Sequence, residues 1–155
     1  MQLSGAYTFD SDQETVWQRL MDPQAIAQAL PGVDELIPIE GETQAWRATA
    51  KIGLASVNGT YTGVIRLSEI QSPHQYRLSV SGEGQQSIIN GTALLKLSYD
   101  SEQQKTVLTW DAEASISGKL ASVGQRLIGA AANMLSRQFF GALARQLPAR
   151  QQPHT

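Results

Sequence analysis

The chain has 155 residues, of which 41% are hydrophobic and 17% are charged, a composition typical of one globular domain with a sizeable core. Its 12 Lys and Arg against 14 Asp and Glu give a net charge of −2, with no sign of nucleic-acid binding. Cys is absent and only His74 and His154 are present, which excludes disulfides, thiolate chemistry and zinc–cysteine sites, and leaves almost nothing to build a multi-histidine metal site.

No targeting signal is visible in the sequence. Residues 1–5 lack the basic start and the apolar run of a signal peptide. No stretch approaches the ~20 apolar residues that a membrane-spanning helix needs. We therefore expect a soluble, cytoplasmic protein.

The first predicted elements are a strand and two short helices. Residues 2–10 alternate between apolar and polar side chains, which predicts a strand. Helical spacing of apolar residues predicts a helix over about 12–21. Asp22 can cap a helix and Pro23 suits a first helical position, so a second helix is expected over about 23–29.

Six further strands are predicted from alternating apolar and polar residues. They cover about 33–40, 46–54, 57–70, 76–80, 93–99 and 108–116. Residues 82–84 (Gly-Glu-Gly) are expected to interrupt the sheet, and residues 100–105 to form a polar hairpin. One apolar and one polar face are typical of an antiparallel sheet that is covered on one side.

The C-terminal region reads as one long helix over 119–146, because apolar residues recur there at helical spacing. The order of elements predicts an α+β fold: a curved antiparallel sheet of about seven strands wrapped around this helix. We expect a single domain over residues 1–147, followed by a flexible C-terminal tail over 148–155.

Small residues recur on the predicted apolar face of the sheet and in the middle of the long helix. They are Ala48, Ala50, Gly59, Gly63, Ala93, Ala112, Ala114 and residues 129–132. Small residues facing each other leave either very close packing or a void, and a lasting apolar void usually holds a ligand. Both alternatives remain open from the pattern.

Aromatic residues with a polar atom are large enough to line such a cavity and to bind a ligand's carbonyl or hydroxyl. For each aromatic residue taken singly, a place in a packed core is commoner than a contact with a ligand. The candidate cavity-lining residues are Trp17, Leu20, Trp46, Ala50, Ile52, Tyr61, Tyr76, Leu95, Trp110, Ala112, Leu127, Ala131 and Met134.

The charge distribution gives a second signal. After Glu113 the chain has no acidic residue and five basic ones. A basic helix with exposed apolar residues can dock on an anionic membrane or an acidic partner. Alternatively, basic residues near a helix C-terminus stabilise the helix by interacting with its dipole. The candidate docking residues are Lys119, Arg126, Arg137, Phe139, Phe140 and Arg145.

The sequence gives only weak indications of a catalytic site. Asp111 and Glu113 are two residues apart and share one face of a strand, but this is the polar, outward face. Glu83 lies in a Gly-Glu-Gly turn with no helix after it, so it does not form a phosphate loop. We expect no catalytic residue and no metal ligand.

Several segments together are similar to a known family. They are Leu3-Ser4-Gly5, Val16-Trp17, Asp22-Pro23, residues 30–33 (Leu-Pro-Gly-Val), residues 51–53 (Lys-Ile-Gly), residues 59–63 (Gly-Thr-Tyr-Thr-Gly) and residues 117–128, which open the last helix. Over about residues 2–146 the chain resembles the carbon monoxide dehydrogenase CoxG family, a branch of the START-like, Bet v 1-like (SRPBCC) superfamily. The resemblance implies a helix-grip fold.

The resemblance also implies a function. It implies a non-catalytic accessory protein of a molybdenum-hydroxylase-type dehydrogenase, which binds a quinone or other lipid and contacts the inner face of the membrane. No cofactor is expected to be covalently bound. Because the chain stops soon after Leu147, reversible rather than permanent membrane contact is expected. The alternatives are an assembly or docking factor with a filled cavity and, with less support, a cyclase- or hydrolase-type enzyme.

Overall fold

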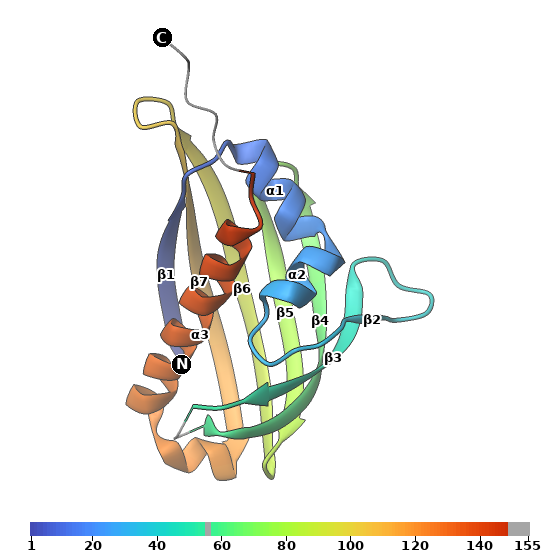
Figure 1. Ribbon diagram of the computed structural model, residues 1–155. Coiled ribbons are helices and arrows are strands. Elements are labelled where there is room, and N and C mark those ends of the chain that lie inside the picture. The colour runs from blue at the N-terminus through green and yellow to red at the C-terminus, as the bar shows by residue number, and fades with distance from the viewer. Residues whose placement is uncertain (55–56, 149–155) are drawn as a thin grey trace.

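A curved antiparallel sheet wraps around one long helix in this protein (Figure 1). The structure is a computed structural model that describes residues 1–54 and 57–148. The three α-helices are α1 (Gln13–Met21), α2 (Pro23–Ala29) and α3 (Gln125–Arg145), and all three lie against the concave face. The predicted α+β helix-grip architecture is confirmed.

Seven strands form the sheet in the order β1-β7-β6-β5-β4-β3-β2. Their bounds are β1 (Gln2–Phe9), β2 (Ile37–Pro38), β3 (Ala45–Ile52), β4 (Gly59–Gln71), β5 (Gln75–Gly84), β6 (Ser87–Asp100) and β7 (Lys105–Gly118). Each strand from β2 to β6 pairs with the next one in sequence. The first strand instead pairs with the last, with Gln2 opposite Glu113 and Phe9 opposite Thr106.

The two short helices begin where the sequence predicts. Asp22 caps α2: its carboxylate oxygen Oδ1 accepts a hydrogen bond of 3.0 Å from the backbone N–H of Gln24, and Pro23 takes the first helical position. Val16 and Leu20 of α1 are completely buried, as helical spacing requires. These two helices therefore close one end of the sheet.

The main core lies at that closed end. Its completely buried side chains include Phe9 at the end of β1, Leu108 near the start of β7 and Leu143 in the last turns of α3. Burial of one such side chain contributes roughly 1.5–3 kcal/mol relative to exposure. The core thus fixes α1, α2 and the C-terminal half of α3 against one half of the concave face.

The predicted single helix over 119–146 is wrong. Lys119–Val123 forms a short 3₁₀ helix, η2, and α3 starts only at Gln125. Gly118 and Gly124, which flank η2, have φ of 87° and 95°. A backbone in this left-handed region cannot continue a right-handed helix, so the chain turns at both glycines.

Three strand boundaries also need correction. The strand predicted over 93–99 begins six residues earlier, at Ser87. Of the predicted strand 33–40, only Ile37–Pro38 pairs as a strand, although the N–H of Ile39 still donates to the carbonyl oxygen of Ala45 at 3.1 Å. The predicted interruption at 82–84 is instead the end of β5, and the turn follows at Gln85 and Gln86, both with positive φ. The predicted tail continues past Pro148, outside the described residues.

Candidate ligand-binding face

Helix α3 lies toward one edge of the sheet. Its backbone runs close to α2, β1 and η2 rather than to the central strands (Figure 1). A Cβ placed on Gly129 in the middle of α3 would lie 3.7 Å from side-chain atoms of Leu3 and Met1, both at the β1 edge. Opposite the middle of α3, the backbone of the helix therefore does not lie over the central strands, which only side chains can cover.

One half of the concave face is a packed core. Six of the predicted cavity-lining residues are buried there: Trp17, Leu20, Trp46, Tyr76, Leu95 and Trp110. The rings of Trp17 and Tyr76 meet edge to face with centroids 5.6 Å apart. These residues hold α1 and the sheet together, and ligand contact by any of them stays a prediction.

The other half of the concave face is partly open. Ala50, Ile52, Tyr61, Ala112 and Ala131, all predicted to line a cavity, are only partly buried although they belong to the apolar face or to α3. This half is nearer the Gly59 end of β4 and the Gly118 end of β7. Solvent therefore reaches apolar side chains on the inside of the grip.

Two glycines on this half have room above them. A Cβ on Gly82 of β5 would meet only the carbonyl oxygen of Thr62, at 3.6 Å. A Cβ on Gly91 of β6 would meet the Glu113 carbonyl oxygen at 3.5 Å and the Ala114 Cβ at 4.0 Å. No atom of α3 is within 4 Å of either position, so the helix does not fill the space over these strands.

Two buried indoles direct a polar atom toward accessible space. Trp46 and Trp110 are only 4% and 8% exposed, and neither indole N–H has a hydrogen-bond partner among the described residues. Among the described residues, every side-chain N or O atom that is fully shielded from solvent has a hydrogen-bond partner. Because the two Nε1 atoms have no such partner, they must be accessible to solvent. Each can therefore donate one hydrogen bond to a ligand or to water.

The phenols of this region are neutral donors. The hydroxyl of Tyr61 donates a 2.7 Å hydrogen bond to the carbonyl oxygen of Val57, and burial raises the pKa of Tyr61. Burial raises the pKa of Tyr76 much more strongly. Neither group supplies a negative charge to the concave face at neutral pH.

Two predicted cavity residues lie on the wrong side of α3. Leu127 and Met134 are 50% and 49% exposed, whereas Ile128 and Leu143 of the same helix are buried. A helix advances by 3.6 residues per turn, so positions 127 and 134 fall opposite the buried side. Both residues are part of the outer surface and do not line the concave face.

The predicted docking residues divide into an exposed and a buried group. Lys119, Arg126, Arg137 and Arg145 are exposed, and docking by them stays a prediction. Phe140 is only 5% exposed and meets the ring of Phe9 edge to face, with centroids 6.2 Å apart. The prediction that Phe140 docks on a partner or membrane is therefore wrong. Phe139 also packs partly buried against the core. Both phenyl rings lie on the inward side of α3 and stabilise the fold by packing against the core.

A shallow hollow of about 530 Å³ follows the exposed side of α3. Its lining residues recur at helical spacing: Ala130, Asn133, Met134, Arg137 and Gln138. None of them is acidic, in keeping with the acid-free sequence after Glu113. This surface combines an apolar side chain, Met134, with the guanidinium of Arg137.

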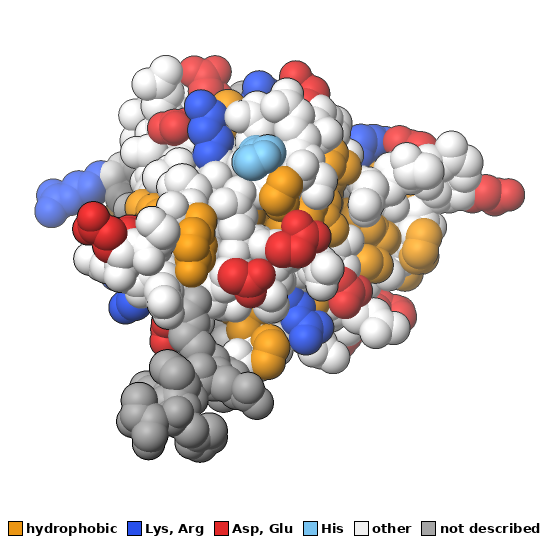
Figure 2. All heavy atoms as spheres, turned by 90° about the horizontal axis from the view of Figure 1, so that it is seen from above, with side chains coloured by type: hydrophobic (Ala, Val, Ile, Leu, Met, Phe, Trp, Pro, Cys, Tyr) orange, Lys and Arg blue, Asp and Glu red, His pale blue; other side chains and the backbone are white. Residues whose placement is uncertain are grey.

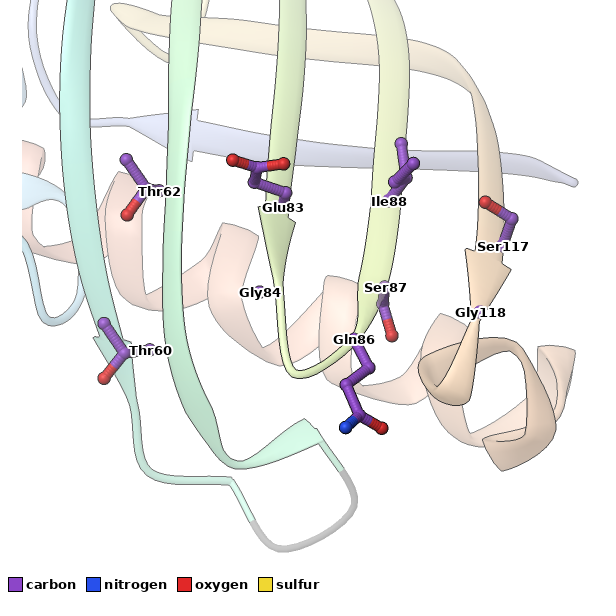
Figure 3. Close-up of a pocket in the computed structure, with 9 residues that line it drawn as sticks. All are labelled: Thr60, Thr62, Glu83, Gly84, Gln86, Ser87, Ile88, Ser117 and Gly118. Atoms are coloured by element: carbon purple, nitrogen blue, oxygen red, sulfur yellow. The ribbon is translucent and has the colours of Figure 1, made fainter.

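A second hollow of about 540 Å³ lies on the opposite, outer face of the sheet (Figure 3). Thr62, Glu83, Ile88 and Ser117 stand directly opposite one another across four strands and form one row of it. Hydroxyl groups and one carboxylate make this surface unsuited to a lipophilic ligand. Periodicity identified the outward face but not this row, because strand register is not visible in the sequence.

The two carboxylates that the sequence places two residues apart lie on the outer face of β7. Asp111 and Glu113 are exposed on the outer face, and Glu113 accepts a 3.1 Å hydrogen bond from the side chain of Gln2. Among the described residues, no cluster of acidic and histidine side chains could hold a metal ion, and no helix is long and apolar enough to cross a membrane.

Acidic and basic side chains are interspersed at the end of the molecule near α1 (Figure 2).

Solved structures share this architecture. A crystal structure of a conserved protein from Geobacillus kaustophilus is 30% identical over 94% of each chain, with a TM-score of 0.88. A START superfamily protein from Mycobacterium smegmatis is 12% identical over 94% of this chain and 96% of that chain, with a TM-score of 0.69. Protein CV1439 from Chromobacterium violaceum is 14% identical over 94% and 96%, with a TM-score of 0.70. No curated protein matches the chain.

The family assignment rests on nearly the whole chain. The sequence profile of CoxG, a subunit of carbon monoxide dehydrogenase, matches residues 5–148. This range begins within β1 and extends past the end of α3, so it includes the sheet, all the helices and the partly open concave face. The chain therefore belongs to the carbon monoxide dehydrogenase CoxG family and has its START-like fold.

Proposed function

We propose that this protein is a non-catalytic accessory protein of a molybdenum-hydroxylase-type, carbon monoxide dehydrogenase-like enzyme. It binds a lipophilic small molecule, a quinone or another lipid, on the partly open half of the concave face. It links the enzyme to the inner face of the cell membrane by reversible contact.

The open apolar half of the concave face carries this proposal. Interiors are normally packed at high density, and apolar side chains left accessible inside a grip favour a ligand of matching character. The space over Gly82 and Gly91, which α3 leaves open, supports binding there. The reachable indole N–H groups of Trp46 and Trp110 are suited to a ligand carbonyl.

The energetics favour a ligand that has both an apolar body and a polar head. Burial of about 400 Å² of apolar surface contributes roughly 10 kcal/mol relative to water. A bilayer offers the same apolar environment, so this term largely cancels when the ligand leaves a membrane. The net preference then depends on shape and on hydrogen bonds to the head group, which is why the two indoles matter.

Partition of a radiolabelled quinone between liposomes and excess protein tests this proposal. We expect quinone to be recovered with the protein, and Gly91→Leu, which fills the open half of the concave face, to reduce recovery. Thr92→Leu on the neighbouring outward position is the matched control and should bind normally. Quinone that remains wholly in the liposomes at every protein concentration would contradict ligand carriage.

The basic side chains of η2 and α3 support contact with an anionic surface. Lys119, Arg126 and Arg137 are exposed, and no acidic residue follows them in the sequence. Replacing all three with Gln should abolish co-flotation with anionic vesicles and leave the unfolding temperature unchanged. Equal flotation of both proteins would rule out this surface as the membrane contact.

The packed half of the concave face favours a second candidate function. If side chains also close the open half in solution, the protein acts as an assembly or docking factor without a ligand. In that case the triple Gln variant loses pull-down of the dehydrogenase, whereas Gly91→Leu has no effect on any activity. Native mass spectrometry of protein purified without detergent distinguishes the two, because only a carrier retains the added mass of a lipid.

A further inference from the structure

Strand β1 forms an edge of the sheet that nothing in the described part of the chain covers. β1 pairs with β7 on one side, and no strand follows it on the other side (Figure 1). Helix α3 reaches β1 through side chains on the concave face, namely Met1, Leu3 and Tyr7. The hydrogen-bonding edge itself is left open.

The ladder with β7 fixes which backbone groups point outward. The N–H of Met1 donates to the carbonyl oxygen of Ala114 at 3.1 Å, and the N–H of Ala114 donates back to the carbonyl oxygen of Met1 at 2.9 Å. In an antiparallel pair such two-way contacts recur at every second residue. The N–H and C=O groups of Gln2, Ser4, Ala6 and Thr8 therefore point away from the sheet.

This edge lacks the features that normally prevent strand addition. Residues 1–9 contain no charged side chain and no proline. The pairing of β1 with β7 runs through eight residues without a bulge, so the edge is continuous. Natural edge strands are usually protected by charge, proline, bulges or a short length.

The opposite edge of the same sheet has those protections. β2 is two residues long and contains Pro38, which has no N–H to donate. The charged side chains of Arg47 and Lys51 lie on β3, next to it. Of the two edges, the β1 edge is therefore the one that offers a row of backbone donors and acceptors for another strand.

We propose that the β1 edge pairs with the β1 edge of a second copy of this chain, in antiparallel orientation about a two-fold axis near Gly5. A second copy fits because the edge side chains are small or neutral and meet their equivalents without like-charge repulsion. The pairing places Ser4 opposite Ala6 and Gln2 opposite Thr8. Four residue pairs then exchange two backbone hydrogen bonds each, more than any shifted register allows.

The proposed dimer has a defined geometry. A two-fold axis between antiparallel strands is perpendicular to the sheet, so the joined sheet has fourteen strands, seven from each copy, and both α3 helices on one side. Both concave faces then open toward the same side. Strand pairing alone belongs to the low end of interface sizes, so the association is weak and depends on concentration.

Sedimentation velocity over a wide concentration range tests the dimer. The unmodified chain is expected to convert from monomer to dimer, and Ala6→Lys to raise the dissociation constant at least about tenfold by placing two like charges on diagonal positions. Thr92→Lys, on the exposed face of the interior strand β6, is the matched control and should dimerise normally. A chain that stays monomeric throughout, or an Ala6→Lys variant that dimerises as well as the control, overturns the proposal.

Cysteine cross-linking tests the register, since the chain has no Cys of its own. The Cα atoms of directly opposite hydrogen-bonded residues lie about 5.5 Å apart, within disulfide range. A mixture of Ser4→Cys and Ala6→Cys proteins should therefore form a mixed disulfide faster than either protein alone forms its own. Equal rates in the mixture and in the single proteins would contradict this register.

Discussion

The indole of Trp110 occupies the space that a side chain at residue 5 would need. A Cβ built on Gly5 would lie 2.7 Å from Cε2, Cζ2 and Nε1 of Trp110, closer than real side chains approach. The two residues are directly opposite in the β1–β7 ladder. Glycine at this position therefore lets a large aromatic residue lie over the edge strand and cover it from the concave side.

We expect Gly5→Ala to displace the Trp110 ring and to lower the free energy of unfolding by about 1–3 kcal/mol through overpacking. Urea denaturation followed by tryptophan fluorescence measures both effects. Gly53→Ala is the control, because nothing lies within 4 Å of its Cβ position and its φ is not in the left-handed region. If both variants unfold at the same urea concentration, the Gly5–Trp110 contact does not constrain the fold.

Ser87 connects the β5–β6 hairpin to the 3₁₀ helix η2. Its buried hydroxyl donates to the carbonyl oxygen of Gln85 at 3.0 Å and accepts from the backbone N–H of Leu120 at 2.7 Å. Ser87→Ala leaves a buried N–H without a partner, so we expect a loss of about 1–3 kcal/mol. Hydrogen exchange at Leu120 should accelerate in this variant but not in Ser122→Ala, whose hydroxyl is exposed.

The buried phenol of Tyr76 predicts a loss of stability in alkali. Burial raises the pKa of Tyr76 in the folded protein, whereas the unfolded chain ionises near the ordinary value of about 10. Above that pH the unfolded state releases a proton that the folded state keeps. The free energy of unfolding therefore falls by up to about 1.4 kcal/mol per pH unit.

Urea unfolding at pH values from 9 to about 11.5 measures this fall. Tyr76→Phe keeps the ring beside Trp17 but removes the ionisable group, so its stability should depend less on pH. Tyr99→Phe is the control, because Tyr99 is 42% exposed. Identical pH profiles for all three proteins would show that Tyr76 ionises as freely in the folded state as in the unfolded one.

The two sides of α3 should respond differently to truncation. Leu143 is completely buried, and Leu143→Ala is expected to cost about 2–5 kcal/mol. Met134→Ala on the exposed side should change stability by less than about 0.5 kcal/mol. Equal losses in chemical denaturation would mean that Met134 is covered in solution, which would place another molecule on that side of the helix.

The fold could be predicted from the sequence where periodicity is strong. Alternation located six of the seven strands, although β6 begins six residues before its predicted start, and Asp22 with Pro23 located the start of α2. Periodicity failed where single residues decide the backbone path. The left-handed glycines at 118 and 124 divided the expected long helix into η2 and α3.

The candidate site could be predicted only in part. The apolar phase of each strand correctly assigned Trp46, Tyr76 and Trp110 to the concave face. Helical spacing could not orient α3, because apolar residues occur on both its buried and its exposed side. The placement of Leu127 on the outer surface depends on how α3 packs against β1 and α2, and such contacts between distant segments are not encoded in local spacing.

Pairing of the first strand with the last has a consequence for biosynthesis. Gln2 meets Glu113, a partner 111 positions later in the chain. At about 5–20 residues per second, a ribosome needs roughly 5–20 s to supply that partner after β1 has been made. The nascent chain therefore carries its uncharged first strand unpaired while strands β2 to β6 are made, and β1 can join the sheet only once β7 is available.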